Sequence, residues 1–162
     1  MSKPTEKEET PPVPFVHRRV INWSDTDAAR IVYTVRFLDF AMEAIEGWFR
    51  AVIGYGWYEM NMDRGVGTPF VKVNIDFKAP LTPKHTLRTT VLVERAGRAS
   101  ITFAVSGERS DGVQSFTGRM VCCAVATGEL KSIEIPKDWR ERIDDYMARC
   151  AEATGVEQGG IN

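Results

Sequence analysis

The sequence predicts an α+β domain in which an antiparallel sheet wraps around one long helix. Residues 34–53 have the apolar spacing of a long helix. Four β-prone segments follow this helix, separated by turn residues and with no second long helix between them. A helix followed by consecutive strands is typical of α+β proteins. The order differs from the alternation of strands and helices in parallel nucleotide-binding sheets.

The predicted long helix has one apolar face and one charged face. Its apolar residues recur at spacings of three and four: Leu38, Ala41, Ile45, Trp48 and Val52. A second stripe with the same spacing is charged: Arg36, Asp39, Glu43, Glu46 and Arg50. Gly54 and Gly56 follow the last apolar residues and predict the end of the helix.

The strands are predicted from alternation and from turn residues. Residues 15–23 are β-prone and stop at the turn-forming run 24–27. In residues 71–78 apolar and polar side chains alternate, which predicts a strand with one apolar face. Pro136 suits the first turn of a second helix over residues 138–152. The remaining strands are expected at residues 86–94, 99–108 and 114–126.

The composition indicates one folded domain with a tail at each end. The chain has 162 residues, of which 43% are hydrophobic and 27% are charged, as in an ordinary globular domain. We predict the folded domain over residues 14–152. Residues 1–13 are charged and proline-rich, and residues 153–162 are rich in glycine, so both segments are predicted to be disordered.

Several classes of function are disfavoured by composition and motifs. The net charge of −1 lacks the basic excess of a general nucleic-acid binder. The sequence contains neither GxGxxG nor GxxxxGK[ST], and its cysteines and histidines lack the spacing of a metal site. No apolar run approaches the roughly 18–20 residues of a membrane span, and the acidic start is unlike a signal peptide. We therefore expect a cytoplasmic protein that binds neither nucleic acid nor membrane.

Two carboxylates lie at the junction between the first strand and the long helix. Asp25 and Asp27 precede a helix whose first amides lack partners within the helix. Those amides and the helix dipole favour negative charge, fixed or developing in a reaction. Such an arrangement suits acyl transfer, with the carboxylate as nucleophile or general base and an amide as oxyanion donor. Two aspartates that merely cap a turn would give the same pattern.

Three motifs resemble those of a known family. Residues 24–33, SDTDAARIVY, are similar to the D-x-D-x-x-G-[IV]-V-[YWF] signature of hotdog-fold acyl-CoA thioesterases of the 4-hydroxybenzoyl-CoA thioesterase type, which include the YbgC-like enzymes. Residues 65–71, GVGTPFV, resemble the family's G-[IV]-x-x-P-[IV]-V stretch, and residues 133–136, IEIP, resemble its I-x-[IV]-P. The resemblance implies the hotdog fold, an antiparallel sheet wrapped around one long central helix.

The resemblance also implies roles for residues in and after the first motif. Asp27 matches the family's catalytic carboxylate, and Thr34 falls where a backbone N–H meets the thioester carbonyl. Tyr33 precedes Thr34 in the pocket-forming turn, and Asp25 is expected to have a supporting role. Arg30 replaces the motif's glycine, which tolerates a positive φ that arginine rarely adopts. Its guanidinium can instead meet a CoA phosphate or a substrate carboxylate.

Further candidates lie outside this motif. Glu43 is the alternative acid, because a second group of hotdog thioesterases uses a glutamate on the central helix, although its charged stripe also fits a solvated or interface face. Trp57, Tyr58 and Phe70 are expected to line an acyl pocket in which an aromatic group would stack, or to be ordinary core. Arg95 and Arg98 resemble a hairpin that contacts nucleotide phosphates in the family, and they fit a solvated turn equally well.

We therefore expect an acyl-CoA thioesterase that hydrolyses the thioester of a small acyl-CoA, with an aromatic acyl group as one option. Coenzyme A enters as part of the substrate, and no metal or redox cofactor is implied. The resemblance implies a homodimer or a homotetramer with sites at the interface. One alternative is a non-catalytic acyl-CoA-binding domain, which Arg30 favours. Another is a hotdog hydratase, which His17 and His85 disfavour because neither lies at a loop-to-helix position.

Overall fold

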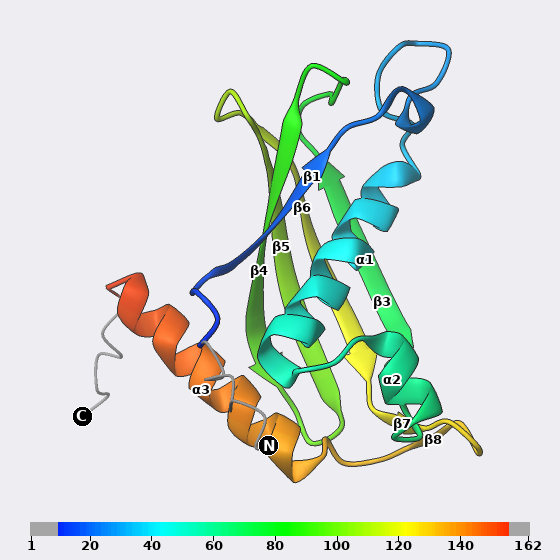
Figure 1. Ribbon diagram of the computed structural model, residues 1–162, viewed down its shortest axis with the longest axis vertical. Helices are drawn as coiled ribbons and strands as arrows, with labels where there is room; N and C mark the ends of the chain where they lie inside the picture. Colours follow the sequence, from blue (N-terminus) through cyan, green and yellow to red (C-terminus); the bar gives the residue numbers. More distant parts are fainter. Residues whose placement is uncertain (1–9, 156–162) are drawn as a thin grey trace, which may run out of the picture.

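The computed structural model describes residues 10–155 and has a five-stranded antiparallel sheet against one long helix (Figure 1). The order of its strands is β1-β4-β5-β6-β3. Their bounds are Phe15–Val20 for β1, Phe70–Phe77 for β3, Thr86–Ala96 for β4, Ser100–Arg109 for β5 and Gln114–Cys123 for β6. A smaller sheet joins β2 (Val66–Gly67), β7 (Val125–Ala126) and β8 (Lys131–Ser132). The predicted α+β class is thereby confirmed.

The long helix forms almost where the sequence predicts it. Helix α1 (Arg36–Trp48) continues into a π-helical turn, η2 (Phe49–Ile53). Gly54 ends this segment with a φ of 101°, in the left-handed region that glycine enters without a steric penalty. The start lies two residues later than predicted, because residues 34 and 35 belong to the turn that leads into the helix.

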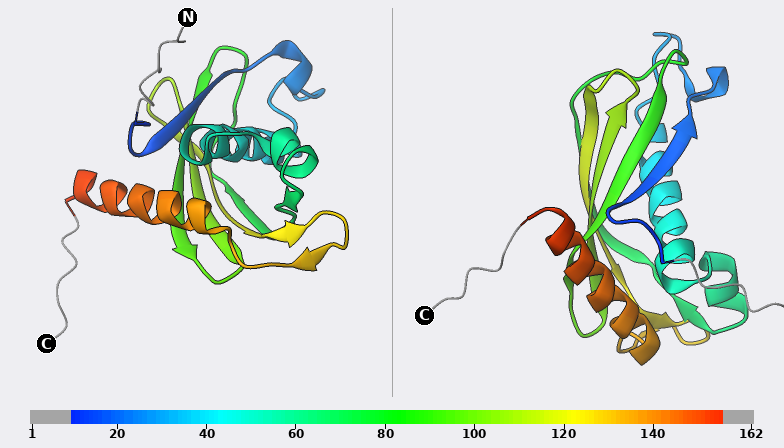
Figure 2. Two further views of the ribbon diagram at one scale, coloured as in Figure 1. Left: turned by 60° about the horizontal axis from the view of Figure 1, so that its bottom comes forward. Right: turned by 60° about the vertical axis from the view of Figure 1, so that its left-hand side comes forward.

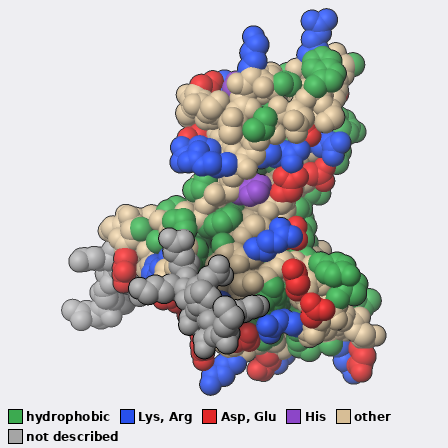
Figure 3. Space-filling view, in the orientation of Figure 1, with side chains coloured by type: hydrophobic (Ala, Val, Ile, Leu, Met, Phe, Trp, Pro, Cys, Tyr) green, Lys and Arg blue, Asp and Glu red, His purple; other side chains and the backbone are tan. Residues whose placement is uncertain are grey.

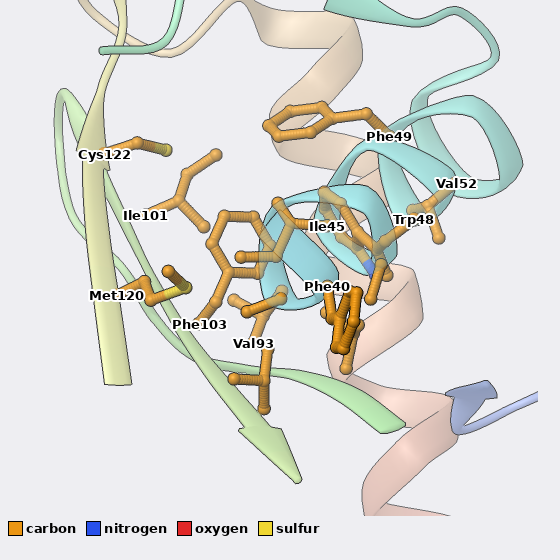
Figure 4. Close-up of a cluster of buried hydrophobic side chains, with 14 of the residues drawn as sticks. Phe40, Ile45, Trp48, Phe49, Val52, Val93, Ile101, Phe103, Met120 and Cys122 are labelled. Atoms are coloured by element: carbon orange, nitrogen blue, oxygen red, sulfur yellow. The ribbon is translucent and has the colours of Figure 1, made fainter. Parts of the chain in front are cut away.

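The apolar face of α1 makes the centre of the core. Ala41, Ile45 and Trp48 have no exposed surface, and the ring of Trp48 meets that of Phe103 on β5 edge to face at 5.0 Å. Figure 4 shows these helix side chains pointing toward side chains of β4, β5 and β6. The prediction of a buried Leu38 was wrong. Its side chain is exposed because the neighbouring Phe37 turns into the core instead.

Helix α3 (Lys137–Ala153) packs against β4 and η2 at one end of the sheet (Figure 2), which confirms the predicted second helix. Tyr146 attaches this helix to two strands. Its hydroxyl donates a hydrogen bond to the carbonyl of Val91 at 2.5 Å and accepts one from the amide of Phe15 at 2.9 Å. Burial raises the pKa of Tyr146, so the hydroxyl remains protonated and able to donate.

Strand β3 lies at an edge of the sheet and carries uncovered apolar side chains. The predicted strand forms, but a register shift between Phe70 and Lys72 interrupts its alternation at Val71, and Val71, Val73 and Phe77 are 64%, 45% and 54% exposed. The ring of Phe77 nevertheless meets that of Phe37 on α1 at 5.2 Å, so this face of β3 lies on the helix side of the sheet. Figure 3 shows hydrophobic side chains at the surface along the right-hand side, where Figure 1 draws β3 and the short helix α2 (Trp57–Met62). The apolar face of β3 thus has no cover in one copy of the chain.

The predicted tails fall largely outside the described residues. Within the described part, the carbonyl of Pro11 accepts a hydrogen bond from Arg149 of α3, so residues assigned to the N-terminal tail touch the domain. None of the helices that the structure describes is both long and apolar enough to cross a membrane. The cytoplasmic location stays a prediction.

The pairing of β5 with β6 allows a test of the core. Gly107 lies opposite Phe116, and a β-carbon on Gly107 would overlap the Phe116 ring, which is fully buried. Because a packed core resists added atoms, we expect Gly107→Ala to lower the free energy of unfolding by about 1–3 kcal/mol in chemical denaturation. An added β-carbon at Gly128 meets nothing within 4 Å, so Gly128→Ala should change it by less than about 0.5 kcal/mol. Equal losses in both variants would contradict this account.

Candidate active site

The first motif forms a closed loop between β1 and α1. After the 3-10 turn η1 (Trp23–Asp25), Thr26 forms a bridge with Val32, and the amide of Asp27 donates to the carbonyl of Ile31 at 3.0 Å. The amide of Val32 donates to the carbonyl of Leu81 at 2.9 Å, which anchors the loop to the segment between β3 and β4. Figure 1 shows the loop at the N-terminal end of α1.

The carboxylate of Asp27 lies at the surface of this loop. Its Oδ1 accepts a hydrogen bond from the amide of Ala29 at 2.8 Å, which orients the side chain. Its Oδ2 has no hydrogen-bond partner among residues 10–155. One carboxylate oxygen is therefore held by the loop, and the other is open to water or a substrate.

The turn before α1 leaves two backbone donors open. The amides of Thr34 and Val35 make no hydrogen bond within the described part of the chain, whereas the next three amides each donate to the carbonyl three residues earlier. An N–H group at this helix terminus can stabilise a developing oxyanion. Tyr33 precedes them with a half-exposed side chain, and its own amide donates to the carbonyl of Asp25 at 2.9 Å.

Arg30 adopts the backbone conformation that the family motif reserves for glycine. Its φ is 64°, in the left-handed region, and its amide donates to the carbonyl of Asp27 at 2.9 Å. The arginine therefore does not prevent the turn from closing, contrary to the concern raised by the sequence. This removes the feature that favoured a non-catalytic domain.

Asp25 and Glu43 meet on a single guanidinium. Arg19 donates from Nη1 to both carboxylate oxygens of Glu43, at 2.5 and 2.7 Å, and from Nη2 to Asp25 Oδ1 at 3.0 Å. The Asp25 side chain is only 4% exposed, and its Oδ2 accepts the amide of Asn22 at 2.8 Å. Burial lowers the pKa of His17, which lies 3.9 Å from Glu43; the carboxylate opposes the shift and Arg19 adds to it.

A pocket of about 590 Å³ lies toward the other end of α1. The rings of Trp57 and Phe70 meet there edge to face at 6.1 Å, so the structure brings these two predicted residues together. The prediction for Tyr58 was wrong, because its side chain points to solvent and is 72% exposed. The lining is mostly apolar and comprises Met42, Trp57, Asn61, Gly67, Thr68, Pro69, Phe70, Val125, Thr127 and Leu130. Sequence reasoning did not identify Asn61, Thr127 or Leu130 as lining residues. Thr68 lies inside the second motif, which could have indicated it.

The loop and the pocket of one chain are far apart. Helix α1 has 13 residues and is therefore about 20 Å long. Figure 1 draws the loop at its first turn, and α2 with β7 at its far end. One copy of the chain thus does not join Asp27 to the pocket around Trp57.

Arg95 and Arg98 lie on the β4–β5 hairpin, at the same end of the sheet as α2 (Figure 1). Both side chains are exposed, and Arg98 forms an ion pair with Glu134 at 3.0 Å. The positive charge of this hairpin is therefore accessible to an anionic group. It lies away from the loop that contains Arg30.

Comparisons with known proteins agree with this arrangement. Residues 21–143 match the Thioesterase-like superfamily. The 1,4-dihydroxy-2-naphthoyl-CoA hydrolase of Thermosynechococcus vestitus is 28% identical over 133 residues, covering 81% of this chain and 84% of that protein. The crystal structure of a thioesterase superfamily protein from Jannaschia sp. CCS1 has a TM-score of 0.79 at 39% identity, covering 86% of this chain and 97% of that one. The 4-hydroxybenzoyl-CoA thioesterase of Pseudomonas sp. strain CBS-3 has a TM-score of 0.72 at 22% identity, covering 78% and 96%.

The fold and these similarities define a thioester hydrolase with a hotdog fold. The chain belongs to the Thioesterase-like superfamily. The predicted fold and the predicted enzyme class are thereby confirmed.

The left-handed backbone at Arg30 allows a test of the loop. A side chain with a β-carbon is disfavoured there by about 1–2 kcal/mol, whereas glycine is not. Glycine also makes the unfolded chain more flexible, which offsets part of this gain. We expect Arg30→Gly to raise the free energy of unfolding by up to about 1 kcal/mol, and Arg30→Ala to give no such gain. A loss of stability in Arg30→Gly, measured by chemical denaturation, would contradict the backbone conformation.

Proposed function

We propose that this protein hydrolyses the thioester of an aromatic acyl-CoA, with Asp27 as the reacting carboxylate and the Thr34 amide as the oxyanion donor. One observation carries the proposal. The loop of a thioesterase-superfamily chain presents a free carboxylate oxygen on Asp27 and an unpartnered amide on Thr34, both within the described residues. These are the two groups that hydrolysis of a thioester requires.

The reaction follows from these two groups. Asp27 takes a proton from water as the water oxygen bonds to the thioester carbon, or its own oxygen bonds to that carbon and forms an anhydride, which water hydrolyses after the thiolate has left. The carbonyl oxygen gains negative charge, which the Thr34 amide and the positive end of α1 stabilise. The carbon–sulfur bond then breaks, and the CoA thiolate leaves and takes up a proton. Water is the only co-reactant in this scheme, and Asp27 activates it or forms the acyl intermediate itself.

Glu43 fits a supporting role better than that of the acid. Both of its carboxylate oxygens are occupied by Arg19, whereas Asp27 has a free oxygen among the described residues. Glu43 also lies on α1 beside β1, which Arg19 connects to it. We therefore assign the reaction to Asp27 and keep Glu43 as the residue to test against it.

The acyl pocket suits a flat aromatic group. Trp57 and Phe70 offer ring surfaces in a mostly apolar lining, where an aromatic acyl group can stack. Two of the similar proteins are named for 1,4-dihydroxy-2-naphthoyl-CoA and 4-hydroxybenzoyl-CoA, both aromatic thioesters. The phosphates of CoA are assigned to the arginines: Arg30, Arg95 and Arg98.

A homodimer would complete the site. If β3 pairs antiparallel with β3 of a second copy, the Phe70 end of one strand lies beside the Phe77 end of the other. Phe77 contacts the first turn of α1, so the Asp27 loop of one copy would approach the pocket of the other. Pairing centred on Asn74 would also set Lys72 of each copy opposite Asp76 of the other, a favourable cross-strand pair.

Thiol release from a panel of CoA thioesters tests the reaction. With benzoyl-, hydroxybenzoyl-, naphthoyl-, phenylacetyl- and fatty acyl-CoA, we expect the highest kcat/KM for an aromatic acyl group. Asp27→Asn should lower kcat by about 10²–10⁴-fold, because a general base or nucleophile is lost. Asp144→Asn, an exposed aspartate on α3, is the matched control and should keep kcat within twofold.

Two results of this assay would overturn the assignment. The first is an unchanged rate in Asp27→Asn. The second is a larger loss in Glu43→Gln than in Asp27→Asn, because a supporting Glu43 should cost less than about tenfold. Tight binding of acyl-CoA without turnover in the wild type would favour a binding domain.

A charge on the free face of β3 tests the dimer. Val73→Lys should yield a monomer in sedimentation analysis, because a lysine at an edge strand opposes pairing. Its rate of thiol release should fall at least tenfold, because the loop and the pocket are then separated. Val113→Lys is the control, since Val113 is exposed on the β5–β6 hairpin away from this edge. A monomeric Val73→Lys with full activity would show that one chain suffices.

A further inference from the structure

Arg19 is a charged and largely buried residue to which the proposed reaction gives no role. It lies on β1, and its side chain is 22% exposed. Its guanidinium lies 4.4 Å from the centre of the Phe40 ring on α1, and its Nε is buried without a partner in the described chain. In Figure 3 a histidine near the middle of the face lies beside acidic and basic side chains, in the region where Figure 1 shows β1 next to α1. The positive charge of Arg19 on β1 therefore lies against the surface of α1.

Arg19 connects three separate elements. Nη1 binds Glu43 on α1, and Nη2 binds Asp25 at the start of the motif loop. A guanidinium can do this because its donors point in fixed, divergent directions, whereas a lysine ammonium is a single point of charge. Two carboxylates, one almost fully buried, share this one cation. Their mutual repulsion is therefore balanced only while Arg19 remains in place.

Asp25 connects Arg19 to the loop that contains Asp27 and Thr34. Its Oδ2 accepts the amide of Asn22 before the loop, and its carbonyl accepts the amide of Tyr33 after the loop. Asp27 lies between these two contacts, and the amide of Thr34 comes directly after the second. Both ends of the loop are thus attached to the residue that Arg19 binds.

We propose that Arg19 is a positioning residue for thioester hydrolysis, which holds the Asp27–Thr34 loop at the start of α1 by bridging Asp25 and Glu43. The proposal rests on the function proposed above. Arg19 is not one of the reacting groups; it sets the position of Asp27 relative to the Thr34 amide. A displacement of about 1 Å between reacting groups can cost on the order of 10²-fold in rate.

The test compares Arg19→Lys with Arg50→Lys, the same change in an exposed ion pair with Glu46 near the far end of α1. Arg19→Lys should lower kcat by about 10–100-fold and change KM by less than about threefold, since the loop moves but the acyl pocket does not. The amide of Tyr33 should exchange with solvent faster. Arg50→Lys should leave kcat and exchange within twofold. A folded Arg19→Lys enzyme with unchanged kcat would overturn the proposal.

A double-mutant cycle shows whether Arg19 acts through Asp25. In an Asp25→Asn background, adding Arg19→Lys should lower kcat by a further factor of less than about three, because the ion pair between Arg19 and Asp25 is already lost. Equal factors in both backgrounds would overturn the proposal. If Arg19→Lys does not fold, Glu43→Gln provides the second variant, with a several-fold fall in kcat and faster exchange at Tyr33. An inactive wild type in which Arg19→Lys still speeds this exchange would refute the proposed function but leave the restraint intact.

Discussion

Burial of the apolar face of α1 is the constraint on which the other parts of the structure depend. Each large side chain that leaves water there contributes roughly 1.5–3 kcal/mol, and Ile45 and Trp48 are fully buried. The apolar face packs against the sheet, which sets the orientation of the helix. That orientation places the motif loop at one end of α1 and the Trp57 pocket toward the other. The geometry of the candidate site is thus a result of core packing.

The cluster of Arg19, Asp25 and Glu43 between β1 and α1 is polar, unlike the apolar face of α1. Burying Asp25, and packing a guanidinium on Phe40, carries a desolvation cost, and such clusters are often no more stabilising than apolar residues would be. The cluster has a geometric effect that apolar side chains cannot reproduce, because directional hydrogen bonds fix where the loop begins and ends. Stability and loop geometry therefore come from different parts of the molecule, the first from the core and the second from Arg19.

Periodicity was sufficient to predict α1, α3 and the five strands of the main sheet, because each depends on neighbouring residues. The short elements α2, β2 and β8 were not predicted, because two to six residues carry too little periodicity. The motif loop was also found, since Asp25, Asp27 and Thr34 lie close together in sequence. The contact between Arg19 and Glu43 was not predicted, because it joins residues 24 apart whose side chains meet only after β1 packs on α1. A weak signal was present: on a strand, Arg19 shares a face with Ile21, which is buried. The exposure of Leu38 was likewise not predicted, because it depends on which side of α1 faces the sheet.

The uncovered face of β3 has a consequence for how the protein behaves before it associates. An edge strand with free N–H and C=O groups and exposed valines can template pairing with any extended chain, so it is an aggregation hazard. The lysines at positions 72 and 78 reduce this hazard, because charge on an edge disfavours unselective stacking. If a second copy of the chain covers this face only in the folded state, the melting temperature rises with protein concentration, by mass action. Thermal stability of this chain is then a property of its concentration as well as of its sequence.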